Sequence, residues 1–432
     1  MPRPDPAPPP ATPPRLVRFL AEGEEAPAAR WGAVTADEDG VPVELVDLGG
    51  VAPELQGTAA AAEPFDAARL QTALVAAERV ADEPGAARWD GHRYRLEPAD
   101  LARRLLSPVP LGQAELDRGE RHVLGAGLNF RAHRAETRTG TGAAGLLLFP
   151  KPTAPTGAYA PVPAAPLLDF EVEIALVLLA DLDLRAPPRP DRLLDHIAFA
   201  LANDVSDRKP IILDPRTGYT HGKGRPGFLP LGPWLVSGRH LPVRMGDELG
   251  EVALELALHT KPRGATGWTM RQQARSTHMI AGPLAILRAA ADARVCMLDA
   301  AGTPRHLHPP DGVLRAGSLI LTGTPGGTAI RAPGPLQKLA LLVRGGFSRQ
   351  GAAHRYLTDQ VERRAALGYL GPGDAVEASA PTTDGGPGLG RQRWHVAGTD
   401  QGGTAPVDRA AAAASSTRAG SGTGAPRAEN DP

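Results

Sequence analysis

The ten residues LDFEVEIALV at 168–177 constrain the fold of this chain more than any other segment, because acidic and apolar residues alternate along them. Asp169, Glu171 and Glu173 stand at every second position, with apolar residues between and after them. A β-strand sends successive side chains to opposite faces, so the run predicts a strand with one apolar and one acidic face. Like charges at this spacing repel each other. The acidic face is therefore either solvated at a sheet edge or neutralised by a divalent cation.

A further oxygen ligand is available in FALANDVSDR at 199–208. As a strand, this segment places Asp204 on the same face as Ala200 and Ala202, where a ligand can approach closely. An Asn-Asp pair is also typical of a turn, which leaves a structural interpretation open. Together, Glu171, Glu173 and Asp204 would form an all-oxygen, anionic site that suits Mg²⁺, Mn²⁺ or Ca²⁺ and disfavours zinc.

A His/Glu pair lies in GAGLNFRAHRAET at 125–137. His133 and Glu136 are three residues apart, so on one helical turn they face the same way. A carboxylate beside an imidazole orients the ring and raises its basicity, which a general base acting on water requires. The same spacing is also common in surface ion pairs.

Lysine is scarce in this chain, so each lysine that is present attracts attention. The five are Lys151, Lys209, Lys223, Lys261 and Lys338. Lys223 stands between two glycines, which allow a ligand to approach the backbone, although a solvated loop lysine would look the same.

The loop LTGTPGG at 321–327 follows an apolar run and offers backbone N–H groups and hydroxyls to an anion. The hydroxyls of Thr322 and Thr324 and backbone N–H groups such as that of Gly323 could hold an oxyanion or a carboxylate, although turns of this composition are common.

Bulk properties narrow the class of protein. The formal net charge of −1 predicts neither a nucleic-acid partner nor an anionic membrane partner. No apolar stretch approaches the roughly 18 residues of a membrane span, and the Pro-rich start lacks the apolar core of a secretory signal. A single cysteine, Cys296, excludes an internal disulfide framework. These features favour a soluble cytoplasmic protein.

The sequence divides into four parts. Residues 1–14 and 398–432 are predicted to be disordered tails, because neither has an apolar period. Residues 15–112 combine short strand patterns with a helical pattern at 64–82, which predicts a small N-terminal α+β domain. Residues 118–397 carry many short strand patterns and few helices, typical of a β-rich core closed on itself.

The ordered series GLNFRAHRAE, LFPKP, DFEVEIALVL, FALANDVSDR, GKGRPGFLPLGPWLV, LTGTPGG and LGPGDAVEAS resembles the fumarylacetoacetate hydrolase family over roughly residues 120–380. The resemblance implies a mixed β-roll catalytic domain, usually dimeric. It implies Mg²⁺ or Mn²⁺ held by Glu171, Glu173 and Asp204. It also implies a water-activating dyad of His133 and Glu136, with Lys223 and Thr324 contacting the substrate or the developing anion.

Family substrates are 1,3-dicarbonyl compounds or 2-oxo acids, so the resemblance implies metal-dependent hydrolysis of a carbon–carbon bond. A decarboxylase, isomerase, hydratase or cyclase with the same site, in a specialised biosynthetic pathway, is the alternative, and a non-catalytic scaffold is a third possibility. The chain departs from the family pattern after Lys223 and in two insertions, at about 291–311 and 328–366. Both insertions flank strands of the expected site and so bear on substrate identity.

Overall fold

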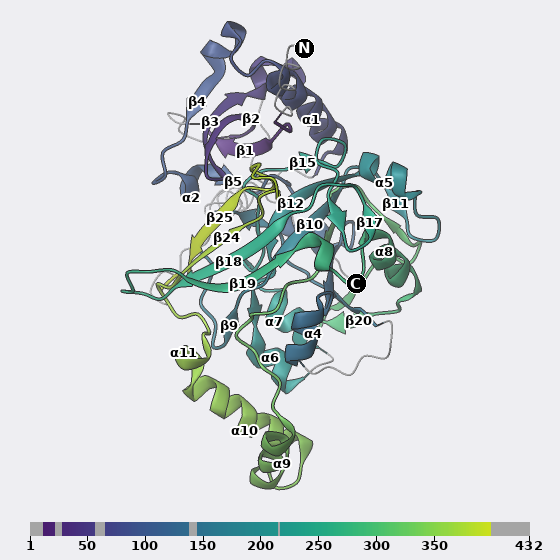
Figure 1. Ribbon diagram of the computed structural model, residues 1–432. Coiled ribbons are helices and arrows are strands. Elements are labelled where there is room, and N and C mark those ends of the chain that lie inside the picture. Colours follow the sequence, from purple (N-terminus) through teal and green to yellow (C-terminus); the bar gives the residue numbers. More distant parts are fainter. Residues whose placement is uncertain (1–11, 22–27, 57–64, 138–144, 215–216, 399–432) are drawn as a thin grey trace, which may run out of the picture. The chain divides into compact units, whose positions relative to one another are not determined.

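A computed structural model describes residues 12–21, 28–56, 65–137, 145–214 and 217–398. Of the two predicted tails, only residues 12–14 and 398 fall among these; the rest lies outside the described residues. The described part is β-rich with peripheral helices (Figure 1), which confirms the predicted α+β fold class. None of its helices combines the length and the apolar character that crossing a bilayer requires.

The N-terminal elements form a five-stranded sheet with one long helix against it, drawn in purple and blue in Figure 1. The strand order is β4 (Arg93–Arg95), β3 (Val41–Asp47), β2 (Ala29–Glu38), β1 (Leu16–Leu20) and β5 (Leu105–Leu106). Helix α1 (Ala67–Asp82) begins where the Asp66 carboxylate caps the N–H groups of residues 68 and 69. Its buried stripe contains Leu70, Leu74 and Ala77, as the helical period predicts.

A larger sheet forms the centre of the molecule and carries both segments singled out above. Its strand order is β7 (Leu147–Pro150), β6 (Val123–Gly127), β23 (Leu319–Leu321), β10 (Val172–Leu178), β12 (Ile197–Asn203), β14 (Pro230–Leu231) and β8 (Thr156–Gly157), with β15 (Val236–Ser237) also paired to β12. A second, four-stranded sheet has the order β19 (Thr269–Arg275), β18 (Glu255–Lys261), β24 (Ala375–Ser379) and β25 (Arg391–His395).

Short strand pairs and helices complete the described part. The strand pairs are β9 (Leu168–Asp169) with β13 (Ser206–Asp207), β11 (Leu182–Asp183) with β22 (Val313–Leu314), β16 (Arg244–Met245) with β17 (Glu248–Leu249), and β20 (Cys296–Leu298) with β21 (Pro304–His306). The further helices are α2 (Leu101–Arg104), α3 (Gln113–Asp117), α4 (Arg131–Thr137), α5 (Pro190–His196), α6 (Arg208–Leu213), α7 (Gly218–Lys223), α8 (Pro283–Asp292), α9 (Pro335–Arg344), α10 (Arg349–Glu362) and α11 (Arg364–Leu367).

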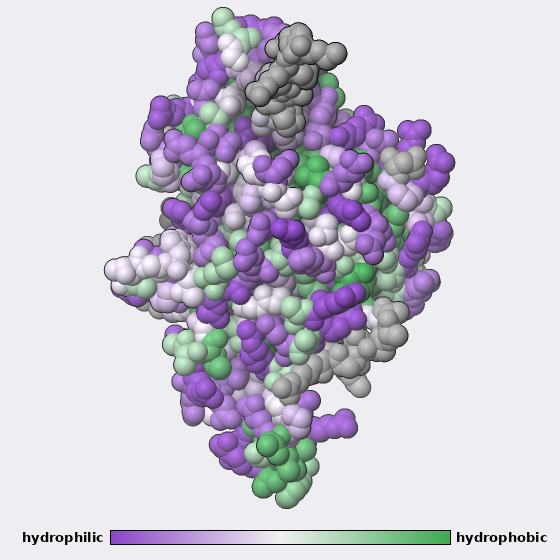
Figure 2. Space-filling model, in the orientation of Figure 1, coloured by the Kyte–Doolittle hydropathy of each residue, from purple (hydrophilic) through white to green (hydrophobic). Residues whose placement is uncertain are grey.

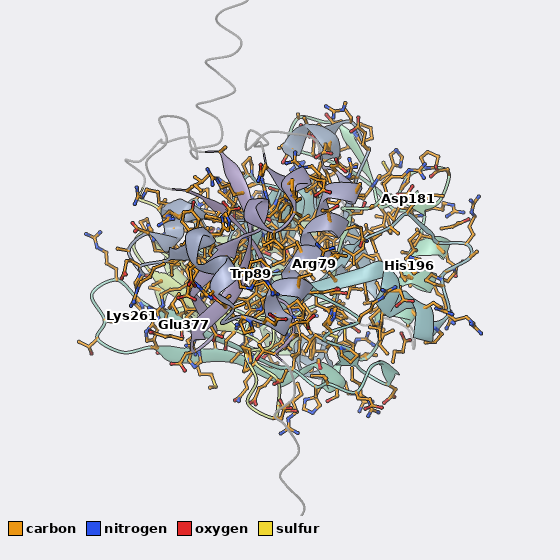
Figure 3. All side chains as sticks on the ribbon, turned by 90° about the horizontal axis from the view of Figure 1, so that it is seen from above. Arg79, Trp89, Asp181, His196, Lys261 and Glu377 are labelled. Atoms are coloured by element: carbon orange, nitrogen blue, oxygen red, sulfur yellow. The ribbon has the colours of Figure 1, made fainter. Side chains whose placement is uncertain are left out.

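Hydrophilic residues cover most of the face shown in Figure 2. In the view from above, Arg79 and Trp89 lie on the N-terminal elements nearest the reader (Figure 3). Trp89 is nevertheless buried, and its indole N–H donates to the Glu83 carbonyl at 3.0 Å.

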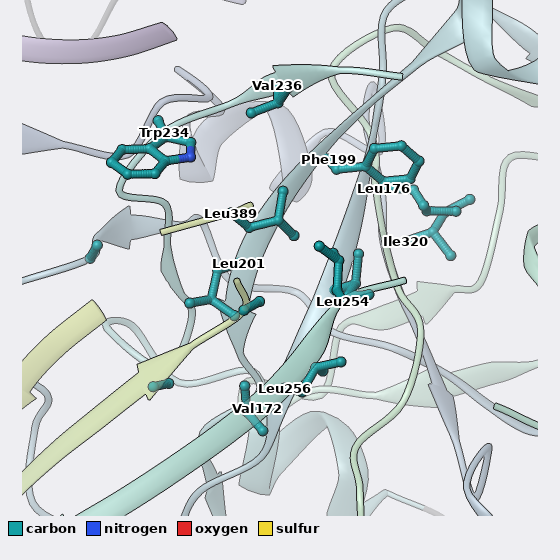
Figure 4. Packing of buried hydrophobic residues seen from close by; sticks show 14 of the residues in the cluster. Val172, Leu176, Phe199, Leu201, Trp234, Val236, Leu254, Leu256, Ile320 and Leu389 are labelled. Atoms are coloured by element: carbon teal, nitrogen blue, oxygen red, sulfur yellow. The ribbon is translucent and has the colours of Figure 1, made fainter. Parts of the chain in front are cut away.

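The two faces of the central sheet pack into different hydrophobic clusters, because β10 and β12 are buried on both sides. One face carries large residues, among them Leu176, Phe199 and Leu201, which pack with the four-stranded sheet (Figure 4). The other carries small residues such as Ala200 and Ala202, which pack in one cluster with α1. Glu173, the register partner of Ala202, lies on the side of these small residues.

One strand prediction was wrong in detail. The run from 168 to 177 is not one continuous strand. Strand β9 pairs with β13 and strand β10 pairs with β12, and Phe170 and Glu171 between β9 and β10 belong to neither strand. In the gap, the Phe170 N–H turns to the Asp169 carboxylate at 2.9 Å and the Glu171 N–H to the Asn203 side chain at 3.1 Å. Side-chain acceptors replace the backbone partners that a continuous strand would have used.

The predicted insertions form distinct structures. The first, at about 291–311, contains the hairpin of β20 and β21, and the second, at 328–366, contains α9, α10 and most of α11. The helical pattern of LTDQVERRAALGYL at 357–370 covers only the C-terminal part of α10 together with α11, and α9 was not predicted. The division of the chain near residue 112 stays a prediction, since both large hydrophobic clusters combine residues from either side of it.

We predict that Phe199→Ala lowers the free energy of unfolding by about 3–5 kcal/mol, the usual cost of emptying a phenylalanine site in a core. Phe199 is fully buried between the central and four-stranded sheets. The matched control is Phe347→Ala, at a phenylalanine that is 77% exposed, with an expected change within about 0.5 kcal/mol. Urea titration of both variants gives the comparison, and equal losses would contradict the packing described.

Candidate metal centre and active site

Antiparallel pairing of β10 with β12 brings three carboxylates together at one end of the central sheet. Glu173 is the register partner of Ala202, and the Asp204 N–H donates to the Glu171 carbonyl at 2.8 Å. Glu171, Glu173 and Asp204 offer oxygen atoms that all lie within 4.8 Å of one another, and all three residues are buried. The three residues that the sequence assigned to one candidate metal site therefore lie together in the structure.

Three buried cations surround these carboxylates. Lys223 Nζ donates to Glu171 Oε2 and to Asp204 Oδ2, both at 2.6 Å. Lys151 Nζ lies 2.7 Å from Asp204 Oδ1 and donates to the Lys223 carbonyl at 2.6 Å, which also holds the C-terminal end of α7. Arg208 donates to Glu171 Oε1, and its Nε donates to Asp169 Oδ2 at 2.8 Å. Both lysines are therefore part of the site.

The formal charges in this cluster do not balance. Four carboxylates, those of Asp169, Glu171, Glu173 and Asp204, face three cations, and every one of these residues is at least 94% buried. The Lys151 ammonium is near Asp204 Oδ1, but not in hydrogen-bond geometry, so this buried oxygen makes no hydrogen bond within the described part of the chain. An oxygen-only, net-negative and desolvated set of side chains fits a hard divalent cation.

This environment shifts the pKa values of the two glutamates in opposite directions. Burial would raise the pKa of Glu171, but Arg208 and Lys223 outweigh it and lower that pKa to about 2. Burial raises the pKa of Glu173, and the charges of Asp204 and Glu171 raise it further. Glu173 is thus the carboxylate that most needs a cation, because its nearest side-chain neighbours are acids.

The His133–Glu136 pair lies on α4 and is tied to the loop after β23. His133 Nδ1 lies 3.8 Å from Glu136 Oε2, which is longer than a hydrogen bond. The Gly327 N–H donates to both oxygens of Glu136, at 3.0 and 3.1 Å, and Arg331 Nη1 lies 3.2 Å from Oε2. Burial alone would raise the pKa of Glu136, but His133, the Gly327 N–H and Arg331 together lower it. The pair is therefore part of a larger polar network, not an isolated surface contact.

The loop after β23 acts on the metal ligands directly. The Gly323 N–H donates to Glu173 Oε2 at 2.7 Å and so orients that carboxylate. Gly323 has φ +97°, and a Cβ there would lie 2.6 Å from the Ala126 carbonyl oxygen, so only glycine fits. The Thr324 hydroxyl accepts a hydrogen bond from Gln272 Nε2 at 2.8 Å, which leaves its own proton for another acceptor. Binding of substrate by Thr324 and Gly323 stays a prediction.

Asp169, the first acid of the alternating run, does not share the position of the other two. Its carboxylate accepts hydrogen bonds from the Ala329 N–H at 2.8 Å, the Ile330 N–H at 3.2 Å and Arg208 Nε. The strand break at Phe170 turns it toward the start of the second insertion. Asp169 therefore anchors that segment beside the site, and the expectation that three acids in step share one face was wrong for this residue.

Three residues of the site were missed by the sequence analysis. Arg208 and Gln272 hold Glu171 and Thr324, and Arg331 reaches Glu136 from the second insertion. An arginine four residues after Asp204, and a glutamine in a strand pattern, were the available signals, and neither is specific. For Arg331 there was none, because its contact depends on how the insertion folds back.

Comparison with known proteins gives a consistent family assignment. The family model described as fumarylacetoacetate (FAA) hydrolase C-terminal matches residues 122–397. The chain is also 31% identical over 257 residues to Protein Rv2993c of Mycobacterium tuberculosis, which covers 58% of this chain and 78% of that protein. The family resemblance inferred from the motifs is thereby confirmed.

Solved structures show the same fold. A putative HpcE protein from Mycobacterium smegmatis aligns with TM-score 0.53 and 20% identity, covering 89% of this chain and all of that one. A probable 2-hydroxyhepta-2,4-diene-1,7-dioate isomerase from Mycobacterium abscessus aligns with TM-score 0.50 and 19% identity, covering 89% of this chain and 98% of that one. At these identities the likeness extends to the fold.

We predict that Glu173→Gln raises the melting temperature of the metal-free protein at neutral pH, because it removes one of three mutually repelling carboxylates. The same change should weaken Mg²⁺ binding by about 100-fold or more, since altering even a residue behind a metal ligand costs 10–100-fold. Thermal melts in EDTA and in Mg²⁺, with calorimetric titration of Mg²⁺, measure both effects.

The matched control is Glu377→Gln, at a buried glutamate that pairs with Arg391 and Arg393 outside the site. This variant should melt lower in EDTA, because it leaves two arginines without their carboxylate, and should keep its response to Mg²⁺. A Glu173→Gln protein that melts lower in EDTA and still responds to Mg²⁺ would contradict the metal centre.

Proposed function

The chain belongs to the fumarylacetoacetate hydrolase family and is an enzyme of that family, and we propose a reaction for it on this basis. The enzyme would use Mg²⁺ or Mn²⁺ to hydrolyse a carbon–carbon bond in a 1,3-dicarbonyl or acylpyruvate-type 2-oxo acid. The observation that carries the proposal is the convergence of Glu171, Glu173 and Asp204 in a buried cluster with excess negative charge. As in the sequence-based expectation, we propose a cytoplasmic homodimer acting on a small-molecule substrate.

Glu171, Glu173 and Asp204 would hold the cation, with the Gly323 N–H and Arg208 fixing two of these carboxylates. The bound cation would supply a Lewis acid for two neighbouring substrate oxygens. Oxygen-only ligands at a buried site favour Mg²⁺ or Mn²⁺ over softer metals.

The dyad would supply the base. Glu136 faces His133 Nδ1 and so favours the tautomer with its proton on that atom, which makes Nε2 the basic nitrogen. In our proposal Nε2 removes a proton from water, and the hydroxide adds to the substrate carbonyl carbon. The adjacent carbon–carbon bond then breaks, its electron pair forms an enolate, and the proton on Nε2 passes to the enolate carbon.

Lys223 would act on the enolate. Its ammonium already lies between two carboxylates, and burial, which alone lowers the pKa of a lysine, is outweighed by Asp204 and Glu171, so the pKa of Lys223 is raised. A permanently charged ammonium stabilises the enolate oxygen without a proton transfer. The Thr324 hydroxyl accepts from Gln272, so its own proton would be left to donate to the substrate carboxylate.

Decarboxylation or isomerisation is the second candidate, with hydratase and cyclase reactions as further variants of it. These reactions need the enolate but not a base aimed at water. The favouring observation is the 3.8 Å separation of His133 Nδ1 from Glu136 Oε2, which is loose for a dyad although catalytic hydrogen bonds often tighten only with substrate. The structural neighbour from M. abscessus is itself named as a probable isomerase.

We predict that His133→Ala slows hydrolysis of an acylpyruvate by roughly 10²–10⁴-fold, the usual contribution of a positioned base, and leaves Mg²⁺ affinity unchanged. Decarboxylation of oxaloacetate, which requires no attacking water, should fall less. Both reactions are measured at saturating Mg²⁺, with product identification.

The matched control is His240→Ala, which removes another His/Glu pair, 3.6 Å apart, with Glu78 on α1. Its rates should equal those of the wild type. Equal losses of both reactions in His133→Ala would instead show that His133 acts on the substrate itself. Turnover of oxaloacetate alone by the wild type would favour the second candidate.

A further inference from the structure

The second insertion is strongly basic, although the formal net charge of the whole chain is −1. Between residues 331 and 358 there is no Asp or Glu, and the cations are Arg331, Lys338, Arg344, Arg349 and Arg355. This segment has a formal charge of +5 in a chain of net charge −1. A basic amphipathic segment is typical of surfaces that meet an anionic partner.

Helix α9, in this segment, also exposes a continuous apolar stripe. Leu336, Leu339 and Val343 are 84%, 59% and 52% exposed, and Phe347 just beyond the helix is 77% exposed. The spacing of three and four residues places Leu336, Leu339 and Val343 on one face of α9, and Phe347 follows three residues after the helix ends. In Figure 2 the hydrophobic colour gathers over the position that α9 has in Figure 1. Exposed apolar side chains in such a cluster mark an interaction surface.

The inner side of the hairpin is fixed, so the stripe is not an unfolded segment. Leu341 is buried, and α10 packs against both α9 and α6. The Tyr356 hydroxyl donates to the Arg331 carbonyl, and the Tyr369 hydroxyl donates to Gln360 Oε1 at 2.9 Å. The α9 stripe therefore faces outward while the hairpin stays attached to the fold.

A cationic pocket opens where the hairpin turns. Its volume is about 380 Å³, and its lining includes Arg344, His354, Arg355 and Thr358. It lies beside the first turns of α10, whose Ser348 cap accepts the Gly351 N–H at 2.9 Å. Arg344 Nη1 lies 3.8 Å from Asp359 Oδ2 and is partly neutralised there, so Arg355 and the positive end of the helix dipole are what favour a phosphate group at this place.

We propose that the α9–α10 hairpin docks on an anionic phospholipid surface, with the stripe of Leu336, Leu339, Val343 and Phe347 in the acyl boundary and the flanking cations at the headgroups. A convex apolar ridge with basic edges fits an interfacial helix. A helical protein partner would need a groove in which to lie. A second copy meeting the same stripe would bring two +5 segments together, which repel each other.

The test is co-sedimentation of the full chain with vesicles of phosphatidylcholine alone or mixed with phosphatidylglycerol. Binding is expected only to the mixed vesicles and should weaken with added salt. The double change Lys338→Glu with Arg344→Glu should weaken binding by about 25-fold or more, since each cation near the membrane contributes about fivefold. The double change Leu336→Asp with Phe347→Asp should abolish it, because both side chains would enter the acyl boundary.

Matched controls make these losses interpretable. Met270→Asp with Leu298→Asp alters residues that are 51% and 44% exposed elsewhere, and Arg95→Glu with Arg192→Glu alters exposed arginines of the same charge. Both controls should bind as the wild type does. Equal binding to neutral and mixed vesicles, no effect of the stripe variant, or a dimer in light scattering that the stripe variant dissociates would overturn the proposal. Neither the reaction nor the metal centre enters this test, so its failure leaves the proposed function untouched.

Discussion

The rest of the site depends on one constraint, the burial of four carboxylates, those of Asp169, Glu171, Glu173 and Asp204, near one end of the central sheet. Carboxylates are stable away from water only when cations or N–H groups surround them. Arg208, Lys223 and Lys151 supply the cations, and the Gly323 and Ala329 N–H groups supply hydrogen bonds. The order of α6, α7 and the loop after β23 around the sheet follows from this requirement, because each of them brings one of these partners.

The use of a lysine at position 223 has a physical explanation in this setting. An arginine presents a planar fork of donors, whereas an ammonium presents three donors from one compact charge. Lys223 Nζ reaches Glu171 and Asp204 at equal distances of 2.6 Å, a position between two carboxylates that suits a compact charge. Arg208, by contrast, spans Asp169 and Glu171 with two different nitrogens. The compact ammonium thus contacts two carboxylates through one nitrogen, and the planar guanidinium bridges two carboxylates through two nitrogens.

The second insertion connects the site to the surface. It begins beside Asp169, which accepts two of its N–H groups, and Arg331 contacts Glu136. Its outer helix carries an apolar stripe, while the inner helix packs on α6, which begins at Arg208. The same segment thus contacts the dyad at one end and exposes an apolar stripe at the other.

Much of the fold and the core of the site could be predicted from sequence, because they depend on local periodicity and residue chemistry. Alternation at Glu171 and Glu173, the small residues around Asp204 and the helical stripe of α1 are properties of neighbours along the chain. The ordered motifs added the family.

Only the tertiary structure decided which groups meet. Arg208 and Lys223 reach Glu171 from 37 and 52 residues away, Gly323 reaches Glu173 from 150 residues away, and the break at Phe170 separates Asp169 from the acids that follow it. Such contacts depend on how strands pair and loops close, and local periodicity contains no information about either.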